Sequence, residues 1–194
     1  MSTSIERFNS AKSAYVAGDF AKAKILLDNV IEESESSPFG VGARYLRGRG
    51  YEDGAFSDKP DLLRAYEDFE IVKAHAVDYG SDGLLGCARV LFELDARGNF
   101  REIVELCEKA VSLDSNVKAM MLLGRIYDQV VGNGGIARRW YLRAYLQGLP
   151  WGMRYFARSH ARDGNAFRSI FAHAFATLTS PVLVLLYGAR SPFK

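Results

Sequence analysis

Apolar residues recur along the chain at helical spacing. One run places apolar side chains at positions i, i+3, i+4, i+7 and i+8, namely Ala23, Leu26, Leu27, Val30 and Ile31. This spacing puts all of them on one face of a helix. The long stretches between glycines repeat it and do not alternate as strands do, and only five prolines are present. The pattern predicts an all-α protein.

Short turns centred on glycine separate these helical stretches. They cover residues 17–20, 52–54, 97–100, 131–134 and 163–165. The residue that closes a helix often adopts a left-handed conformation, which glycine tolerates best. Each turn is therefore predicted to divide one unit of the chain into two helices.

A second set of breaks separates the units from one another. These breaks fall at residues 36–38, 79–81, 114–116 and 147–150. The predicted helix pairs lie near residues 4–34, 41–79, 82–113, 116–147 and 150–179. A period of this length is typical of helical repeats, so the chain is predicted to hold about five helix-turn-helix units.

Several of these segments carry a family resemblance. Residues 119–127, AMMLLGRIY, followed by residues 139–148, RWYLRAYLQG, resemble the Sel1-like repeat pattern A-x-x-x-L-G-x-x-Y and W-Y-x-x-A-x-x-x-G. Residues 48–54, GRGYEDG, are similar to the middle of that motif. Residues 17–23, AGDFAKA, and 107–114, CEKAVSLD, resemble the related tetratricopeptide (TPR) repeat.

The resemblance implies a right-handed α-α superhelical solenoid. We expect the repeats to form one domain over residues 1–180, followed by an apolar C-terminal helix and basic tail over residues 181–194. In such repeats small residues let the first helix press against the second, and aromatic side chains fill the gap between units. Trp140 and Tyr141 are therefore expected in the core.

Composition fits a folded, soluble chain. Of its 194 residues, 48% are hydrophobic and 25% charged, as is usual for a single globular domain. The first ten residues, MSTSIERFNS, lack the apolar segment of a signal peptide, so a cytoplasmic location is the expectation. Cys87 and Cys107 have no CxxC spacing and are expected to be core residues rather than a disulfide or zinc ligands.

Candidate catalytic groups are few. His75, His160 and His173 lie in different predicted helices, and His160 occupies the place where the repeat usually has tyrosine, so packing is the expected role. No metalloprotease, esterase or phosphate-loop motif is present. We therefore expect no enzymatic activity, no cofactor and no metal site.

The charge is distributed unevenly. The net charge is +2, but residues 1–97 hold 12 basic and 17 acidic side chains, whereas residues 98–194 hold 13 and 6. From Arg138 onward nine residues are basic and only Asp163 is acidic. Such polarisation indicates contact with something anionic, although a solvated basic face is the alternative.

One cation follows the small residue of the first helix in every predicted unit. The five are Lys12, Arg49, Arg89, Arg125 and Arg158. In the TPR resemblance this position points into a concave groove, where a row of arginines would favour an acidic peptide, a chain terminus or a polyanion. Acids such as Glu52 and Asp128 could instead neutralise the row. Nucleic acid is the weaker candidate, because no recognition motif accompanies the basic residues.

The segment from residue 170 to 187 is nearly free of ionisable groups. It is shorter than the about 20 residues of a membrane span and contains Ser180-Pro181, which we expect to end one helix and to cap the next. Three alternatives would bury the apolar side chains at this end of the chain: folding back on the last repeat, a protein or homodimer interface, or a membrane surface. The predicted contact residues are Arg154, Arg162, Val182, Leu183, Leu185 and Leu186.

The predicted function is a non-enzymatic scaffold or adaptor that binds a segment of a partner protein, with an acidic segment favoured, in its groove. The alternative is a peripheral membrane component of a bacterial envelope or polysaccharide biosynthesis or secretion system, at the cytoplasmic side of the inner membrane. Basic residues beside an apolar segment favour this alternative, because anionic lipids attract them.

Overall fold

The computed structural model describes residues 3–75 and 79–187, apart from the side chains of residues 180 and 183–187. These residues form ten helices and no strand, which confirms the all-α prediction. The helices are α1 (Ser4–Val16), α2 (Phe20–Ser34), α3 (Pro38–Glu52), α4 (Leu62–Ala74), α5 (Gly80–Asp95), α6 (Phe100–Asp114), α7 (Val117–Gln129), α8 (Gly134–Leu146), α9 (Trp151–Arg162) and α10 (Ala166–Tyr187).

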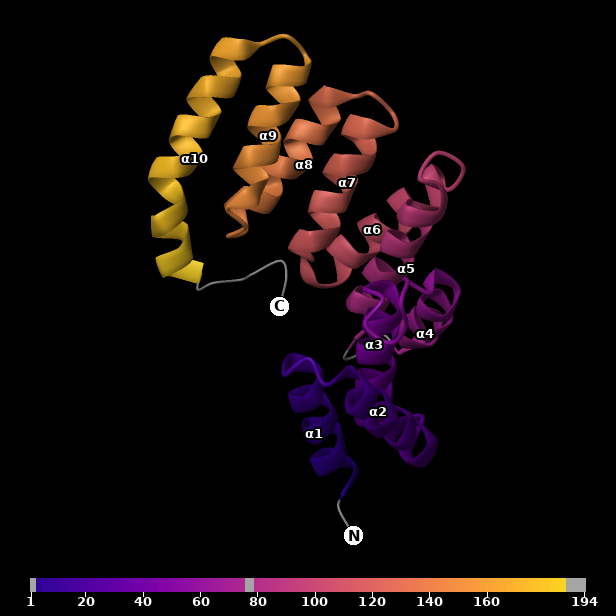
Figure 1. Ribbon diagram of the computed structural model, residues 1–194. Helices are drawn as coiled ribbons and strands as arrows, with labels where there is room; N and C mark the ends of the chain where they lie inside the picture. Colours follow the sequence, from indigo (N-terminus) through magenta and orange to yellow (C-terminus); the bar gives the residue numbers. More distant parts are fainter. Residues whose placement is uncertain (1–2, 76–78, 188–194) are drawn as a thin grey trace. The chain divides into compact units, whose positions relative to one another are not determined.

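The chain divides into two compact units. The first runs from Met1 to Asp95 with α1–α5, and the second from Ala96 to Lys194 with α6–α10. Within each unit consecutive helices pack on one another (Figure 1). The division falls inside the predicted helix pair 82–113, and the single repeat domain over residues 1–180 stays a prediction.

The ends of the helices follow the predicted turn chemistry. Thr3 and Glu6 form a capping box at α1, and Asp19, Ser37, Asp61, Asn116 and Asn133 cap later helices with a side-chain oxygen. Such a cap is worth about 1 kcal/mol. Glycines in left-handed conformation follow five helices, at Gly18, Gly54, Gly132, Gly148 and Gly164, with φ between +71° and +89°. The periodic helix breaks are thus encoded locally.

The core of the first unit depends on a ring held between two glycines. Phe69 of α4 is fully buried. A Cβ atom would lie 2.9 Å from this ring at Gly48 of α3 and 2.4 Å from it at Gly86 of α5. Both distances are shorter than side-chain contacts allow, so only glycine lets the two helices approach the ring.

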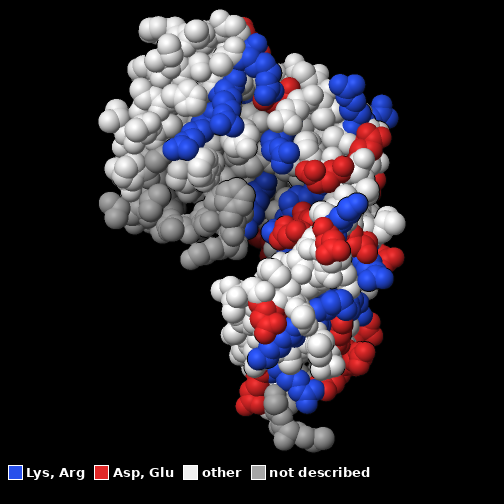
Figure 2. All heavy atoms as spheres, in the orientation of Figure 1, with Lys and Arg blue, Asp and Glu red and all other residues white. Residues whose placement is uncertain are grey.

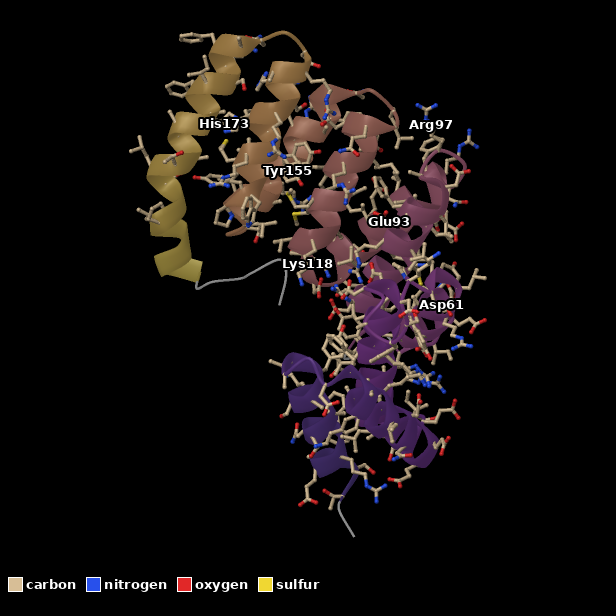
Figure 3. The ribbon with its side chains drawn as sticks, in the orientation of Figure 1. Asp61, Glu93, Arg97, Lys118, Tyr155 and His173 are labelled. Atoms are coloured by element: carbon tan, nitrogen blue, oxygen red, sulfur yellow. The ribbon has the colours of Figure 1, made fainter. Side chains whose placement is uncertain are left out.

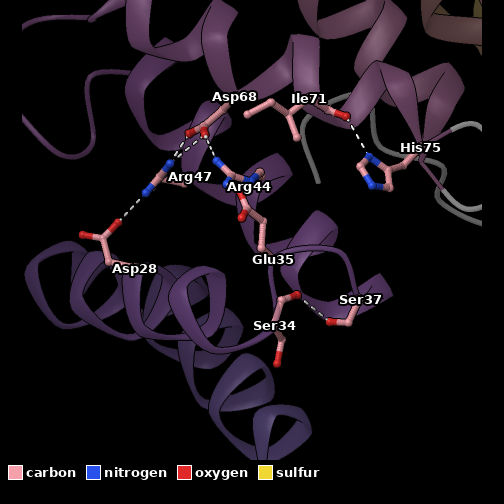
Figure 4. A network of polar contacts seen from close by, with 9 residues as sticks. All are labelled: Asp28, Ser34, Glu35, Ser37, Arg44, Arg47, Asp68, Ile71 and His75. Carbon is pink, nitrogen blue, oxygen red and sulfur yellow. Dashed lines mark hydrogen bonds and ion pairs between the residues drawn. The ribbon is translucent and has the colours of Figure 1, made fainter.

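An ion network centred on the buried Asp68 joins α2, α3 and α4 (Figure 4). The Asp68 side chain is 4% exposed and accepts two hydrogen bonds from Arg47, of 2.9 and 2.7 Å. Arg47 also donates to Asp28 at 2.7 Å. On the other side, Arg44 lies 3.6 Å from Asp68 and pairs with Glu35. One buried carboxylate thereby fixes the positions of two arginines.

Asp28 makes this network sensitive to acid. Burial would raise the pKa of Asp28, but hydrogen bonds from Lys24 and Arg47 outweigh burial and lower it. A carboxyl group with a lowered pKa in the folded state stabilises the fold above its unfolded pKa. That contribution is lost as the pH falls through the folded-state value.

The second unit repeats the contact between glycine and an aromatic ring. Tyr141 of α8 is fully buried, as predicted, whereas Trp140, also predicted in the core, is only half-buried. A Cβ atom at Gly124 of α7 would lie 2.2 Å from the Tyr141 ring. Further along, Tyr145, Met153 and Ala157 form a cluster with Ala172 and Ala176 of α10. The last helix is therefore held through its small residues.

The predicted helix break at Ser180-Pro181 is wrong. Helix α10 continues from Ala166 to Tyr187 with Pro181 inside it. A proline removes one backbone hydrogen bond, here to the carbonyl of Thr177. Pro181 and Thr177 are both exposed, so water can replace the lost bond. The side chains of Leu183, Leu185 and Leu186 lie outside the described residues.

We expect Gly124→Ala to lower the free energy of unfolding by about 1–2 kcal/mol. Overpacking against the buried Tyr141 ring costs about 1–3 kcal/mol, which exceeds the ~1 kcal/mol gained from helix propensity. Gly135→Ala in α8 is the matched control, because its new Cβ atom would meet only the Asn133 oxygen at 3.4 Å. Urea unfolding measures both, and equal effects would contradict the close packing at Gly124.

Asp68→Asn should destabilise the protein by about 3 kcal/mol, because it leaves Arg44 and Arg47 without their shared buried carboxylate. Glu33→Gln removes the partner of Arg7 in a pair whose acid is 44% exposed, and should cost less than about 1 kcal/mol. Thermal unfolding of both variants provides the comparison. A similar loss in the two would show that Asp68 does not organise the helices.

Candidate functional site

Three of the five predicted groove cations belong to the first unit, on successive first helices of the repeats. Lys12 lies exposed on α1, Arg49 half-buried on α3 and Arg89 half-buried on α5. Helix α3 contacts both α1 and α5. We call this the α1/α3/α5 face.

Glu52 of α3 neutralises both arginines of this face. Arg89 donates two hydrogen bonds to the Glu52 carboxylate, of 2.6 and 2.8 Å, and its guanidinium lies 5.6 Å from the Phe69 ring. Arg49 lies 3.6 Å from the same carboxylate and 3.1 Å from Asp53. The acid that the sequence offered as a competing partner is thus engaged with two groove cations.

Tyrosines complete the α1/α3/α5 face. Burial, and next the charge of Asp53, raises the pKa of Tyr15 to about 12. Burial and the Asp82 carboxylate raise the pKa of Tyr45, whose ring stacks on Tyr79 at 6.1 Å. Both hydroxyls are protonated at neutral pH and can act only as hydrogen-bonding groups.

The second unit displays a row of arginines along α9. Arg154, Arg158 and Arg162 stand one turn apart, all exposed, and Figure 2 shows a band of cationic side chains over this helix. Arg154 lies 4.5 Å from the Trp151 ring and Arg158 lies 5.5 Å from the Tyr155 ring. The structure gives these two arginines aromatic rather than acidic partners.

Asp128 of α7 lies beside Arg162, the last arginine of this row. Its side chain is 6% exposed and lies 2.7 Å from Arg162. The Ser159 hydroxyl donates to the other carboxylate oxygen at 3.2 Å. Arg125, the fourth predicted groove cation, lies half-buried one turn earlier on α7. We call the surface that carries Arg125 and Asp128 of α7 and Arg154, Arg158 and Arg162 of α9 the α7/α9 face. Asp128 compensates Arg162 there, and the exposed charge of the face remains at Arg154 and Arg158.

Tyr155, labelled in Figure 3, connects this face to the core of the second unit. Its ring lies 5.4 Å from the ring of Tyr141. Burial, and next the charge of Asp128, raises the pKa of Tyr141, whose buried hydroxyl has no hydrogen-bond partner in the structure. Because the Tyr155 ring packs on the buried Tyr141 ring, it holds a fixed position under the Arg158 guanidinium.

Two of the three histidines, His75 and His160, and both cysteines have surroundings of a structural kind, whereas His173 is exposed on α10. His160 is buried edge-on against Phe156, and burial followed by the charge of Arg138 lowers its pKa. His75 bonds the carbonyl of Ile71 at the end of α4. Cys87 and Cys107 are buried free thiols, and burial raises the pKa of Cys87 to about 12, which makes it a poor nucleophile at neutral pH.

Two other kinds of site are absent from the part of the chain that the structure describes. No group of three or more His, Cys, Asp or Glu side chains there could hold a metal ion. Among the same residues, no helix combines the length and apolar character needed to cross a membrane.

The sequence prediction missed the pairing of arginines with aromatic rings. The sequence does contain a signal for this pairing. Trp151 and Arg154 stand at i, i+3 spacing, as do Tyr155 and Arg158, and residues so spaced are neighbours on a helix surface. The sequence indicated Glu52 as an acid that could neutralise the row, but its bridge to Arg89 in particular could not be read from spacing. These residues lie 37 positions apart and meet only because α3 and α5 share a face.

Comparison with solved structures identifies the fold. MamA matches with a TM-score of 0.66 at 15% identity, covering 95% of this chain and 94% of MamA. A thermophilic TPR protein of Thermus thermophilus matches with 0.69 at 16%, covering 96% and 98%. A kinesin light chain-like protein of Podosopora anserina with nearly identical TPR-like repeats gives 0.66 at 17%, covering 98% and 100%.

The chain has a TPR-like helical-repeat fold. This confirms the fold predicted from the repeat pattern. At these identities the likeness concerns the fold alone. No protein-family model matches the chain, and no curated protein matches its sequence.

Proposed function

We propose that the protein is a non-enzymatic scaffold that binds a segment of a partner protein. Its TPR-like repeats display side chains from successive helices on shared faces, an arrangement suited to holding an extended segment or a helix. Arg49, Arg89 and Arg162 of these faces are engaged in ion pairs, and Arg154 and Arg158 lie over aromatic rings. These side chains do not converge on a reactive group.

The favoured ligand is an acidic segment, bound on the α7/α9 face. The observation that supports this most directly is that Arg154 and Arg158 stand one turn apart with their guanidinium groups over aromatic rings. Stacking on a ring leaves the edge N–H groups of the guanidinium available, and its planar fork suits a carboxylate. Two such forks on one helix face would accept two carboxylates of the same segment.

The α1/α3/α5 face plays a weaker part in this proposal. Glu52 and Asp53 already engage Arg49 and Arg89. An acidic ligand would have to displace these internal carboxylates, which offsets most of the gain in charge pairing. We assign Lys12, Arg49 and Arg89 a secondary contact, with Arg125 and Arg158 in the main one.

The double substitution Arg154→Ala with Arg158→Ala should weaken binding of a fluorescent oligoglutamate peptide at low ionic strength by at least about tenfold, or 1.4 kcal/mol. Arg143→Ala is the matched control, because Arg143 stacks on Trp140 in the same way at 5.5 Å but belongs to α8. Fluorescence anisotropy measures both. No binding by the unmodified protein, or an equal loss in the control, would refute the proposed face.

Glu52→Gln should strengthen binding of the same peptide by a few fold, because it releases Arg49 and Arg89 from their shared carboxylate while the hydrogen-bonding side chain is retained. Anisotropy on this variant is compared with Glu33→Gln, which removes an equal charge from the α1–α2 pair. If both acids have the same effect, the change reflects net charge alone, and the α1/α3/α5 face takes no part in binding.

A further inference from the structure

Helix α10 directs its large apolar side chains away from its own repeat. The residues buried against the rest of the unit are small: Ser169, Ala172 and Ala176. The opposite side exposes Phe167, Ile170, Phe171, Phe175, Leu178 and Val182. Phe167 is 81% and Leu178 77% exposed. A terminal helix of a soluble repeat array normally has a polar outer side, so this outer face needs an occupant.

The charges beside the outer face do not fit an anionic membrane. Residues 166–187 contain one cation, Arg168, and no acid. A helix that lies in a bilayer surface carries several lysines or arginines along its polar side, whereas that side of α10 packs on α9. The arginine row of α9 does not replace them, because α9 directs Met153 and Ala157 toward α10 and holds the row on its exposed side.

We propose that the occupant is the α10 helix of a second copy of this chain, packed antiparallel about Ala174. Residues 167, 171, 174, 178 and 182 follow one stripe of the helix at intervals of three and four, the spacing used by packed helix pairs. Turning a second copy end for end beside the exposed Ala174, about the point midway between residues 174 and 175, sets Phe171 against Leu178 and Phe167 against Val182. The small central residue lets the two backbones approach.

Charge and area support this arrangement. The two Arg168 side chains lie at opposite ends of an antiparallel pair, whereas a parallel pair would bring like charges together. The six exposed side chains retain between 43% and 81% of their surface. With 150–250 Å² for a large aromatic, this is on the order of 700 Å² per copy, close to the about 800 Å² per partner of a stable interface.

Light scattering coupled to size-exclusion chromatography tests the dimer in the full chain. We expect a mass of twice 21.6 kDa for the unmodified protein and 21.6 kDa for Leu178→Glu. Leu146→Glu is the matched control, because Leu146 is an exposed leucine of α8, and it should stay dimeric. Circular dichroism verifies that the variants fold. A monomeric unmodified protein, or a dimer that Leu178→Glu leaves intact, would overturn the proposal.

Cysteine cross-linking tests the orientation. The native thiols of Cys87 and Cys107 are buried, so an introduced thiol reacts without competition. Under mild oxidation Ala174→Cys should give a disulfide-linked dimer, because the two copies of residue 174 face each other. Phe167→Cys should not, since its copies lie at opposite ends. Efficient linkage through residue 167 would refute the antiparallel arrangement.

Vesicle co-sedimentation separates the protein occupant from a lipid one. With vesicles of phosphatidylcholine and phosphatidylglycerol, we expect the unmodified protein to stay in the supernatant as a dimer. A monomer that pellets with vesicles, and fails to do so as Leu178→Glu, would overturn the proposal in favour of a membrane surface. None of these outcomes depends on peptide binding by the α7/α9 face.

Discussion

Close contact between a glycine and a large aromatic ring holds each unit together. Phe69 lies between Gly48 and Gly86 in the first unit, and Tyr141 lies against Gly124 in the second. Helices can approach a ring this closely only where a Cβ atom is missing, and the buried ring in turn fixes the helices on either side. A buried ring can also support a side chain of an exposed face. Arg89 is an example, because its guanidinium lies over the Phe69 ring that Gly86 admits.

Electrostatics then differentiate two faces built on similar scaffolds. On the α1/α3/α5 face Glu52 binds two arginines, so charge is satisfied internally. On the α7/α9 face Asp128 is engaged with Arg162 and Ser159, and aromatic rings support the next arginines along the helix. A ring attracts a cation without neutralising its charge. Equivalent sequence positions in a repeat can therefore have different partners, a carboxylate at Arg89 and an aromatic ring at Arg158.

Much of the fold was predictable because its determinants are local. Helical periodicity and glycines such as Gly18 and Gly164 are read within a few residues, and the resemblance placed Tyr141 in the core. The continuation of α10 through Pro181 was missed, because a helix tolerates proline where exposure lets water replace the lost bond. The pairing of Glu52 with Arg89 depends on two helices meeting, which spacing along the chain does not encode. The orientation of α10 depends on which of its sides packs on α9. Its small residues Ala172 and Ala176 lie on that side, a choice between the two sides that the sequence pattern alone does not make.

The turns differ in the room they offer. A Cβ atom at Gly18, Gly132 or Gly164 would meet nothing within 4 Å, whereas at Gly54, in the loop between α3 and α4, it would lie 3.1 Å from the Pro60 nitrogen. The first three turns are restricted by backbone conformation alone, and asparagine, which also adopts the left-handed region, can serve there. These open turns are where the chain can gain residues or carry a fluorescent label without disturbing either core. At Gly54 the following residues Lys59 and Pro60 pack against the turn. The length of the loop between α3 and α4 is therefore coupled to the packing of these two helices.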